Sequence, residues 1–208
     1  MDGVLADTEA SIIATTKYTL SRYGKTPDPQ VFSRIIGPPL FQIYHEIFGF
    51  DEETAKEATE IYRKYYAEHA IDLIRPFPGV KEMLERLQAG GKKLMVCTAR
   101  YENAASLVLG KLGIADYFCL IGGLNGTGPG ARTKKADVIE YIFRELCIPD
   151  RDRAVMVGDR QDDVLAAKAC GIRSIGALYG FGSRTELETA GADFLAESPE
   201  KIAGLILR

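Results

Sequence analysis

The stretch Val155-Met156-Val157-Gly158-Asp159-Arg160-Gln161-Asp162-Asp163 decides which fold is expected for this chain. Its apolar first residues predict a buried strand, and the residues that follow, 164–171, predict a short helix closed by a glycine. Carboxylates therefore stand directly after the carboxyl end of a strand. In an open α/β sheet this is the edge at which ligands bind, because loops converge there and helix N-termini face it.

Two of these acids, Asp159 and Asp163, would repel each other at such an edge unless a cation lay beside them. Carboxylate oxygens suit Mg²⁺, a hard ion that takes one or two protein carboxylates and often a substrate phosphate. The alternative is a solvent-exposed acidic turn in which Asp163 is the N-cap of the following helix. The stretch by itself leaves both interpretations open.

The composition indicates a compact protein of 208 residues with 46% hydrophobic residues, enough for a substantial core. Lys and Arg number 26 against 29 Asp and Glu, and this net charge of −3 argues against a general nucleic-acid or membrane binder. No membrane-length apolar segment or signal peptide is recognised, so a cytoplasmic monomer or homodimer is expected. The four cysteines are expected to be reduced core residues: Cys97, Cys119, Cys147 and Cys170.

Two regions with different patterns divide the chain. Residues 8–75 contain only helical patterns, whereas strands and helices alternate from residue 76 onward. The expected strands are 93–98, 118–121, 153–158, 174–178 and 194–196, with a glycine-rich loop at 122–130. Such alternation predicts an α/β fold with a doubly wound parallel sheet, helices on both faces, and an inserted all-helical subdomain.

Two further positions lie where a phosphate could bind. Thr98 ends the expected strand 93–98, and its hydroxyl together with the following backbone N–H groups of Ala99 and Arg100 could hold a phosphoryl oxygen. Thr98 could equally be an ordinary β-branched strand residue. Lys135 begins a helix, where a cation is unfavourable for the helix dipole unless it neutralises an anion. Lys134 competes for that role, and an ordinary surface lysine is the simpler interpretation.

Asp2, followed by Gly3, completes a series whose order along the chain is specific. The series Asp2-Gly3-Val4-Leu5, Thr98, Lys135 and Gly158–Asp163 resembles the ordered motifs of the haloacid-dehalogenase-like phosphohydrolases. Further segments make the chain most similar to their phosphoglycolate-phosphatase-like branch: Gly37-Pro38-Pro39-Leu40, Pro78-Gly79-Val80 and Leu178-Tyr179-Gly180-Phe181-Gly182.

The resemblance implies a Mg²⁺-dependent hydrolase of small phosphomonoesters, such as phosphoglycolate or a nucleoside monophosphate, that acts through an aspartyl-phosphate. It implies a Rossmann-like catalytic core at 1–7 and 76–208, with a helical cap at 8–75. Asp2 would be the acid–base residue, Thr98 would bind the phosphoryl group, and Lys135 would neutralise charge. Asp159 would bind Mg²⁺ directly, Asp163 directly or indirectly, and Asp2 through its backbone carbonyl.

In the cap, Arg34, Gly37 and Arg75 are candidates for contacting the leaving group, although both arginines could equally be surface residues. His45 and His69 also lie in the helical region, away from the expected strand ends. We therefore expect both histidines to be structural or exposed.

The chain departs from the family pattern at the first motif, which reads Asp-x-Asp-Gly. Met1 stands at the x position, so the nucleophilic aspartate and the strand before it are missing from this sequence. We expect a shortened copy of a longer active protein, with little activity of its own. The alternatives are an inactive phosphate-binding or regulatory module and a phosphomutase of the same fold. Asp2 argues against a dehalogenase, because a halide leaving group needs no proton.

Overall fold

A computed structural model describes residues 1–126, 128 and 130–208 as two compact units. The first, the core unit, consists of Met1–Asp7 and Arg75–Arg208, and the second, the helical unit, of Thr8–Ile74. Strands β1 (Ala6–Asp7) and β2 (Arg75–Pro76) pair antiparallel within the core unit. The sequence pattern placed Arg75 in the helical region. In the structure Arg75 lies in a strand, because it pairs with Asp7.

The helical unit is built around α1 (Glu9–Ser21) and α4 (Glu52–Tyr65), which pack against each other. Asp51 is the N-cap of α4, and its carboxylate accepts a hydrogen bond of 2.8 Å from the amide of Thr54. Shorter elements complete the unit: the 3₁₀ turns η1 (Pro29–Val31) and η4 (Ile71–Leu73), helices α2 (Phe32–Ile35) and α3 (Leu40–Gln42), and the π-helical segments η2 (Ile43–Ile47) and η3 (Tyr66–Ala70).

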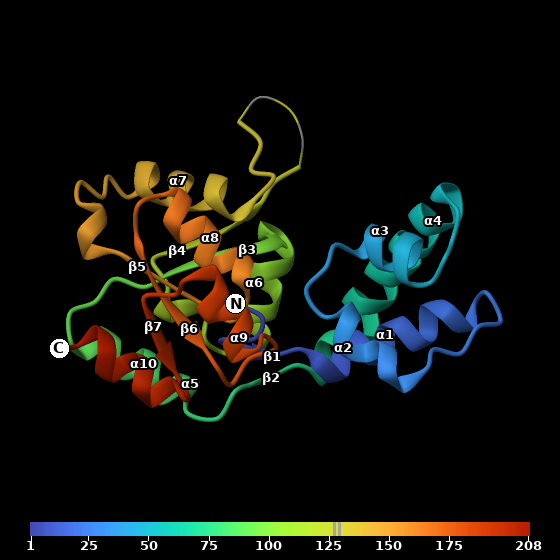
Figure 1. Cartoon of the computed structure of the whole chain (residues 1–208), viewed down its shortest axis with the longest axis horizontal. Coiled ribbons are helices and arrows are strands. Elements are labelled where there is room, and N and C mark those ends of the chain that lie inside the picture. Colours follow the sequence, from blue (N-terminus) through green and yellow to red (C-terminus); the bar gives the residue numbers. More distant parts are fainter. Residues whose placement is uncertain (127, 129) are drawn as a thin grey trace. The chain divides into compact units, whose positions relative to one another are not determined.

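The core unit alternates strands with helices, as the sequence pattern predicted (Figure 1). Its strands are β3 (Met95–Tyr101), β4 (Leu120–Leu124), β5 (Val155–Gly158), β6 (Arg173–Ala177) and β7 (Phe194–Ala196). Its helices are α5 (Val80–Ala89), α6 (Glu102–Lys111), α7 (Lys135–Glu145), α8 (Gln161–Ala169), α9 (Arg184–Ala190) and α10 (Pro199–Ile206), with 3₁₀ turns η5 (Ala115–Tyr117) and η6 (Arg151–Arg153). Figure 1 shows α7 and α8 on one side of the strands and α5 and α10 on the other.

All pairings among β3–β7 are parallel, which confirms the predicted α/β fold with helices on both faces. The hydrogen-bonded strands form two groups, β3-β4 and β5-β6-β7. Among the described residues no ladder joins the two groups, so the series of strands is interrupted between β3 and β5.

The ends of two strands differ from the sequence prediction. Thr98 lies within β3 rather than at its end, because the strand continues to Tyr101 after a shift in its register with β4 between Cys97 and Tyr101. Strand β4 extends to Leu124, into the predicted glycine-rich loop at 122–130. Gly123 permits this extension, since a Cβ there would lie 2.6 Å from the backbone oxygen of Arg100. Residues 127 and 129 of that loop lie outside the described residues.

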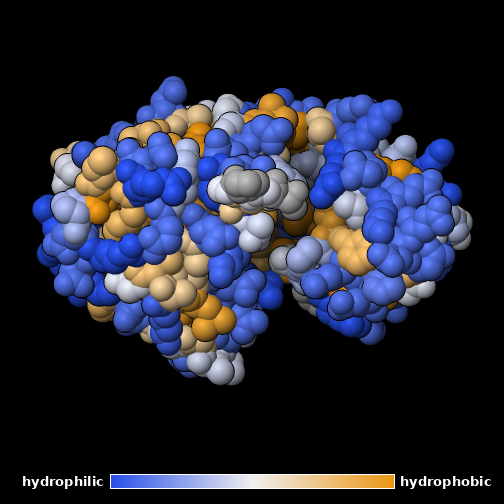
Figure 2. All heavy atoms as spheres, turned by 90° about the horizontal axis from the view of Figure 1, so that it is seen from above, coloured by the Kyte–Doolittle hydropathy of each residue, from blue (hydrophilic) through white to orange (hydrophobic). Residues whose placement is uncertain are grey.

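The core lies between β5 and helices α7 and α8, where one buried cluster consists of Ile139, Phe143, Met156, Ala166, Ala167, Cys170 and Ile172. All four cysteines are free thiols, but Cys119 and Cys147 are exposed, so predicting them as core residues was wrong. The apolar residues that flank them in sequence, Phe118, Leu120, Leu146 and Ile148, are themselves only half-buried. Figure 2 shows one face covered mostly by hydrophilic residues, and no helix in the described part of the chain could cross a membrane.

Candidate active site

Asp159 occupies the carboxyl end of β5 and is only 4% exposed. One of its oxygens, Oδ2, accepts a hydrogen bond of 2.9 Å from the backbone amide of Phe181. Burial raises the pKa of Asp159 to about 6, against the lowering effect of the Phe181 amide, and the nearby negative charge of Asp163 adds to the rise. This carboxylate is therefore held in a position where its charge is poorly compensated by the protein.

The N-terminal turn lies against the same carboxylate. Gly3 adopts a φ of +72°, and its amide closes the turn by donating to the carbonyl of Ala6 at 3.0 Å. A Cβ on Gly3 would lie 1.9 Å from Oδ2 of Asp159, so only glycine fits there. The backbone of the Asp2-Gly3 pair is thus brought beside Asp159 by a contact between residues far apart in the sequence.

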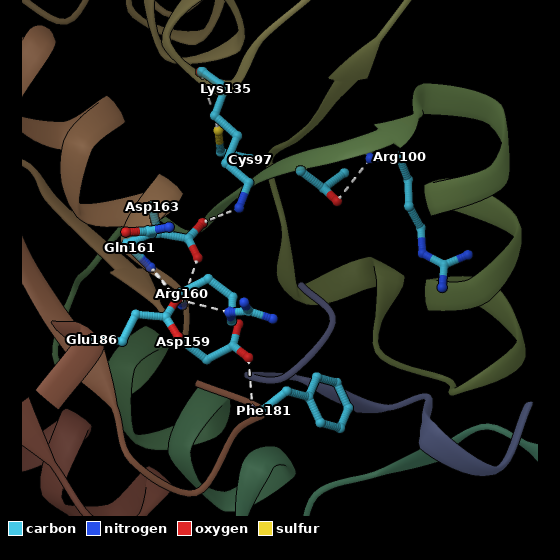
Figure 3. A network of polar contacts seen from close by, with 10 residues as sticks. Cys97, Arg100, Lys135, Asp159, Arg160, Gln161, Asp163, Phe181 and Glu186 are labelled. Carbon is cyan, nitrogen blue, oxygen red and sulfur yellow. Dashed lines mark hydrogen bonds and ion pairs between the residues drawn. The ribbon is translucent and has the colours of Figure 1, made fainter. Parts of the chain in front are cut away.

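Lys135, at the first position of α7, forms an ion pair with Asp163 of α8 (Figure 3). Its Nζ lies 2.7 Å from Asp163 Oδ1, with 18% of the lysine side chain and 7% of the aspartate side chain exposed. Burial acts to lower the pKa of Lys135, but the charge and hydrogen bond of Asp163 outweigh burial and raise it. Lys135 is therefore charged at the edge where the carboxylates gather, whereas Lys134 is exposed.

Asp163 is the third residue of α8 and not its N-cap, which is Arg160. The amide of Arg160 donates to Asp163 Oδ2 at 3.2 Å, while Lys135 binds the other oxygen. Gly158 makes room for this arrangement, because a Cβ there would lie 2.0 Å from the Cβ of Asp163. Both oxygens of Asp163 are thus already bonded within the protein, so its geometry favours orienting Lys135.

The segment Thr98–Arg100 behaves differently from the sequence expectation. Thr98 is 4% exposed, and its Oγ1 accepts a hydrogen bond of 3.2 Å from the amide of Arg100. Two nitrogens of the Arg100 guanidinium donate to the carboxylate of Asp2, Nε to Oδ2 at 2.8 Å and Nη2 to Oδ1 at 2.7 Å. The Sγ of Cys97 lies 3.7 Å from the carbonyl of Lys135, which places this part of β3 beside the start of α7. Arg100 is therefore a partner of the proposed acid–base residue.

Sequence reasoning missed two residues that hold the carboxylate-bearing loop. Phe181 donates its amide to Asp159, and Glu186 of α9 accepts hydrogen bonds from Arg160 Nε at 2.8 Å and from the amide of Gln161 at 2.9 Å. The glycines at 180 and 182 were a signal for close backbone approach near Phe181. No pattern in the sequence indicated Glu186.

The remaining predicted residues, Arg34 and Gly37, belong to the helical unit, as do His45 and His69. His45 Nδ1 lies 2.8 Å from the carbonyl of Phe50, which is a structural contact. The cluster of Asp2, Asp159, Asp163 and Lys135 forms entirely within the core unit.

The donor set of this cluster fits Mg²⁺. No group of three His, Cys, Asp or Glu side chains among the described residues is arranged to hold a metal ion. A magnesium ion, however, usually needs only one or two protein carboxylates and completes its shell with water and phosphate. Asp159 is buried, its charge is destabilised by Asp163, and the Gly3 backbone reaches its oxygen, so a cation beside it would restore the charge balance.

Comparisons with known proteins show the family of this chain. A family model described as haloacid dehalogenase-like hydrolase matches residues 1–177. The chain is 34% identical over 190 residues to a 5'-nucleotidase of Pseudomonas aeruginosa, covering 90% of this chain and 84% of that protein. It is 33% identical over 194 residues to a phosphoglycolate phosphatase of Neisseria meningitidis, covering 90% and 81%.

A solved structure of a haloacid dehalogenase-like family hydrolase from Streptococcus pneumoniae superposes with a TM-score of 0.90. The two sequences are 28% identical, and the match covers 99% of this chain and 94% of the other. The chain therefore belongs to the haloacid dehalogenase-like hydrolases, in the branch that is similar to phosphoglycolate phosphatases and 5'-nucleotidases.

Proposed function

We propose that the core unit is the catalytic part of a Mg²⁺-dependent phosphatase that hydrolyses small phosphate monoesters through an aspartyl-phosphate. The observation that carries this proposal is the convergence of Asp159, Asp163 and Lys135 beside the Asp2-Gly3 turn at the strand ends. Phosphoryl transfer depends chiefly on positioning and on stabilising charge that spreads over the phosphoryl oxygens. A buried cation and a Mg²⁺-binding carboxylate in one cluster suit that chemistry.

Each residue has a distinct role in this proposal. Asp2 donates a proton to the leaving oxygen and later accepts one from the attacking water. Thr98 and the amides after it bind the phosphoryl group, and Lys135, oriented by Asp163, neutralises its charge. Asp159 and the backbone carbonyl of Asp2 hold Mg²⁺, which when bound supplies positive charge to the phosphoryl oxygens.

The nucleophile of this reaction would be a carboxylate two residues before Asp2. In the sequence printed above, Met1 directly precedes Asp2, so no acid of residues 1–208 stands at that position. Among the described residues the strand ladder is interrupted between β3 and β5, which offers a place for a designed strand that ends in such a carboxylate.

The substrate class that we propose is a small phosphate monoester, either phosphoglycolate-like or a nucleoside monophosphate. The relatives named 5'-nucleotidase and phosphoglycolate phosphatase support these two classes at nearly equal identity. We propose that the helical unit acts as the cap, with Arg34 and Gly37 contacting the leaving group together with Arg75, the first residue of β2 in the core unit. If Arg34→Ala leaves the ratio of the kcat/KM values for the two substrate classes unchanged, Arg34 does not contact the leaving group.

The experiment measures release of p-nitrophenol from p-nitrophenyl phosphate in Mg²⁺, at equal concentrations of residues 1–208 and of a chain preceded by a designed strand ending in Asp. We expect activity only in the extended chain, and its loss in Asp159→Asn. Asp116→Asn is the matched control, because Asp116 is exposed on the turn η5 and should leave the rate unchanged.

A second candidate is a phosphate-binding or regulatory module without catalysis. The bidentate pairing of Asp2 with Arg100 favours it, because a carboxylate held in this way is a poor proton donor. A folded extended chain that binds phosphate but releases no p-nitrophenol would support this candidate. Phosphate transfer between two positions of a sugar phosphate, without net hydrolysis, would instead indicate a phosphomutase.

A further inference from the structure

We infer that the segment Tyr179–Gly182, which follows β6, is a positioning element that fixes the Asp159 carboxylate and the N-terminal turn in the geometry needed to bind Mg²⁺. This inference rests on the proposed function, because it assigns residues that act on its metal site through Asp159. The sequence indicated this segment only as part of the resemblance to the phosphoglycolate-phosphatase-like branch and gave none of its residues a role.

The first contact is direct. The backbone amide of Phe181 donates to Oδ2 of Asp159 at 2.9 Å, and Figure 3 shows Phe181 approaching this carboxylate from the side opposite Lys135. A backbone donor has no rotamer freedom of its own, so it restricts the carboxylate more than a side-chain donor would. Because Phe181 bonds to Oδ2, the orientation of the carboxylate depends on the path of this segment.

The second contact is the close packing of the two flanking glycines on Asp159. A Cβ on Gly180 would lie 2.4 Å from the Cβ of Asp159 and 2.3 Å from the carbonyl oxygen of Gly3. A Cβ on Gly182 would lie 1.8 Å from the backbone oxygen of Asp159. Neither glycine has a positive φ, so both are required by space and not by backbone conformation.

The third contact reaches the N-terminal turn. The hydroxyl of Tyr179 donates to the carbonyl of Val4 at 3.0 Å, and its ring packs edge-to-face on Phe77 with centroids 5.3 Å apart. The amide of Phe77 in turn donates to the carbonyl of Leu5 at 3.2 Å. One segment therefore touches both parts of the proposed Mg²⁺ site, Asp159 and the turn that carries Asp2.

Residues that orient a metal ligand from behind commonly change metal affinity by 10–100-fold when they are altered. Because Gly180 lies between Asp159 and Gly3, a methyl group there would separate the two parts of the site. The hydroxyl of Tyr179 acts only on the turn, so its removal should have a smaller effect.

The experiment titrates Mg²⁺ into ¹⁵N-labelled residues 1–208 and follows the amide signals of Gly3 and Phe181. We expect Gly180→Ala to weaken Mg²⁺ binding by about tenfold, at the lower end of the range for residues behind metal ligands, and Tyr179→Phe by less, roughly threefold, because it acts on the turn alone. Gly204→Ala is the matched control, because its added methyl group would meet nothing within 4 Å and Gly204 also lacks a positive φ.

Far-ultraviolet circular dichroism checks that the variants are folded, and Tyr179→Phe remains informative if Gly180→Ala is not. Mg²⁺ affinities of Gly180→Ala and Tyr179→Phe equal to that of the unaltered chain would overturn the inference while leaving the proposed function intact. An unaltered chain whose signals do not respond to Mg²⁺ would instead overturn the metal site of the proposed function, and the inference with it.

Discussion

The two units differ in how they accommodate buried polar side chains. In the helical unit the buried hydroxyls of Ser11, Thr15, Thr19 and Thr59 each donate to a carbonyl of their own helix region three or four residues earlier, at 2.7–2.9 Å. In the core unit the buried carboxylates of Asp159 and Asp163 and the half-buried ammonium of Lys135 have their partners on other elements.

The difference is whether a buried polar group finds its hydrogen-bond partner within its own helix or on another element of the fold. A hydroxyl that donates to the preceding turn of its helix is satisfied wherever the helix forms, and it costs the fold little. A buried charge is tolerated only where tertiary structure brings a partner to it. Buried charges that depend on tertiary partners identify the candidate site. Stability alone would not require the core unit to keep these charges together.

The largest expected effect comes from removing the buried cation. Lys135→Met leaves Asp163 without its ion-pair partner, and we expect a loss of about 3 kcal/mol in the free energy of unfolding of the core unit. Urea titration followed by core-unit amide signals measures it, in EDTA and at pH 7. Lys64→Met, on the exposed part of α4, is the control.

A double variant, Lys135→Met with Asp163→Leu, should recover much of that stability, because neither charge is then left unpaired. Equal losses in the single and double variants would show that the ion pair is not what these residues contribute.

The next effect tests the close approach of the N-terminal turn. Gly3→Ala and Gly24→Ala both place alanine at a positive φ, +72° and +64°, which costs about 1 kcal/mol in each case. Only Gly3→Ala also drives a methyl group into Asp159, whereas nothing lies within 4 Å of a Cβ on Gly24. We therefore expect Gly3→Ala to cost about 2 kcal/mol more, since it displaces a buried group.

Hydrogen exchange of amides in the unit that carries each substitution measures both losses. Similar losses in the two variants would mean that the turn can move away from Asp159 at no cost in stability. The contact between Gly3 and Asp159 would then not distinguish the core unit from the helical unit.

A smaller effect concerns Glu186, which holds Arg160 and Gln161. Burial acts to raise its pKa, but the hydrogen bonds from Arg160 and from the Gln161 amide outweigh burial and lower it. Because the folded-state pKa is below the unfolded one, the stabilisation is present above the unfolded pKa and is lost as the pH falls through the folded pKa.

Glu186→Gln should therefore lower stability by about 1 kcal/mol at pH 7 and leave it nearly unchanged once the pH has fallen below the folded-state pKa of Glu186. Urea titrations of both proteins at a series of pH values give the difference. A difference that stays constant with pH would show that the charge of Glu186 is not involved.

The smallest effect is expected in the helical unit. Thr15→Val removes a hydroxyl that donates to the carbonyl of Ser11 at 2.7 Å, and that carbonyl can still accept a backbone hydrogen bond within α1. We expect a change in the free energy of unfolding below about 0.5 kcal/mol. A loss comparable with that of Lys135→Met would end the distinction between the units, because the hydroxyl would then be a tertiary contact.

Several elements of the site could be predicted from local sequence patterns. Strand β5 with its carboxylates and the start of α7 at Lys135 could be predicted from apolar runs and helix periodicity, which depend on a few neighbouring residues. Thr98 was assigned to the correct strand but not to its place within it, because the register shift in β3 depends on β4.

The sequence by itself therefore determined the alternation of strands and helices, the helical region and the residues that carry charge, since these depend on local propensity and periodicity. Only the tertiary structure decided that Lys135 binds Asp163, that Arg100 holds Asp2 and that Phe181 orients Asp159. These contacts join residues 22 to 98 positions apart in the chain, and burial there makes each partner necessary. Such pairings have no local pattern, because they are selected by the packing of separate elements.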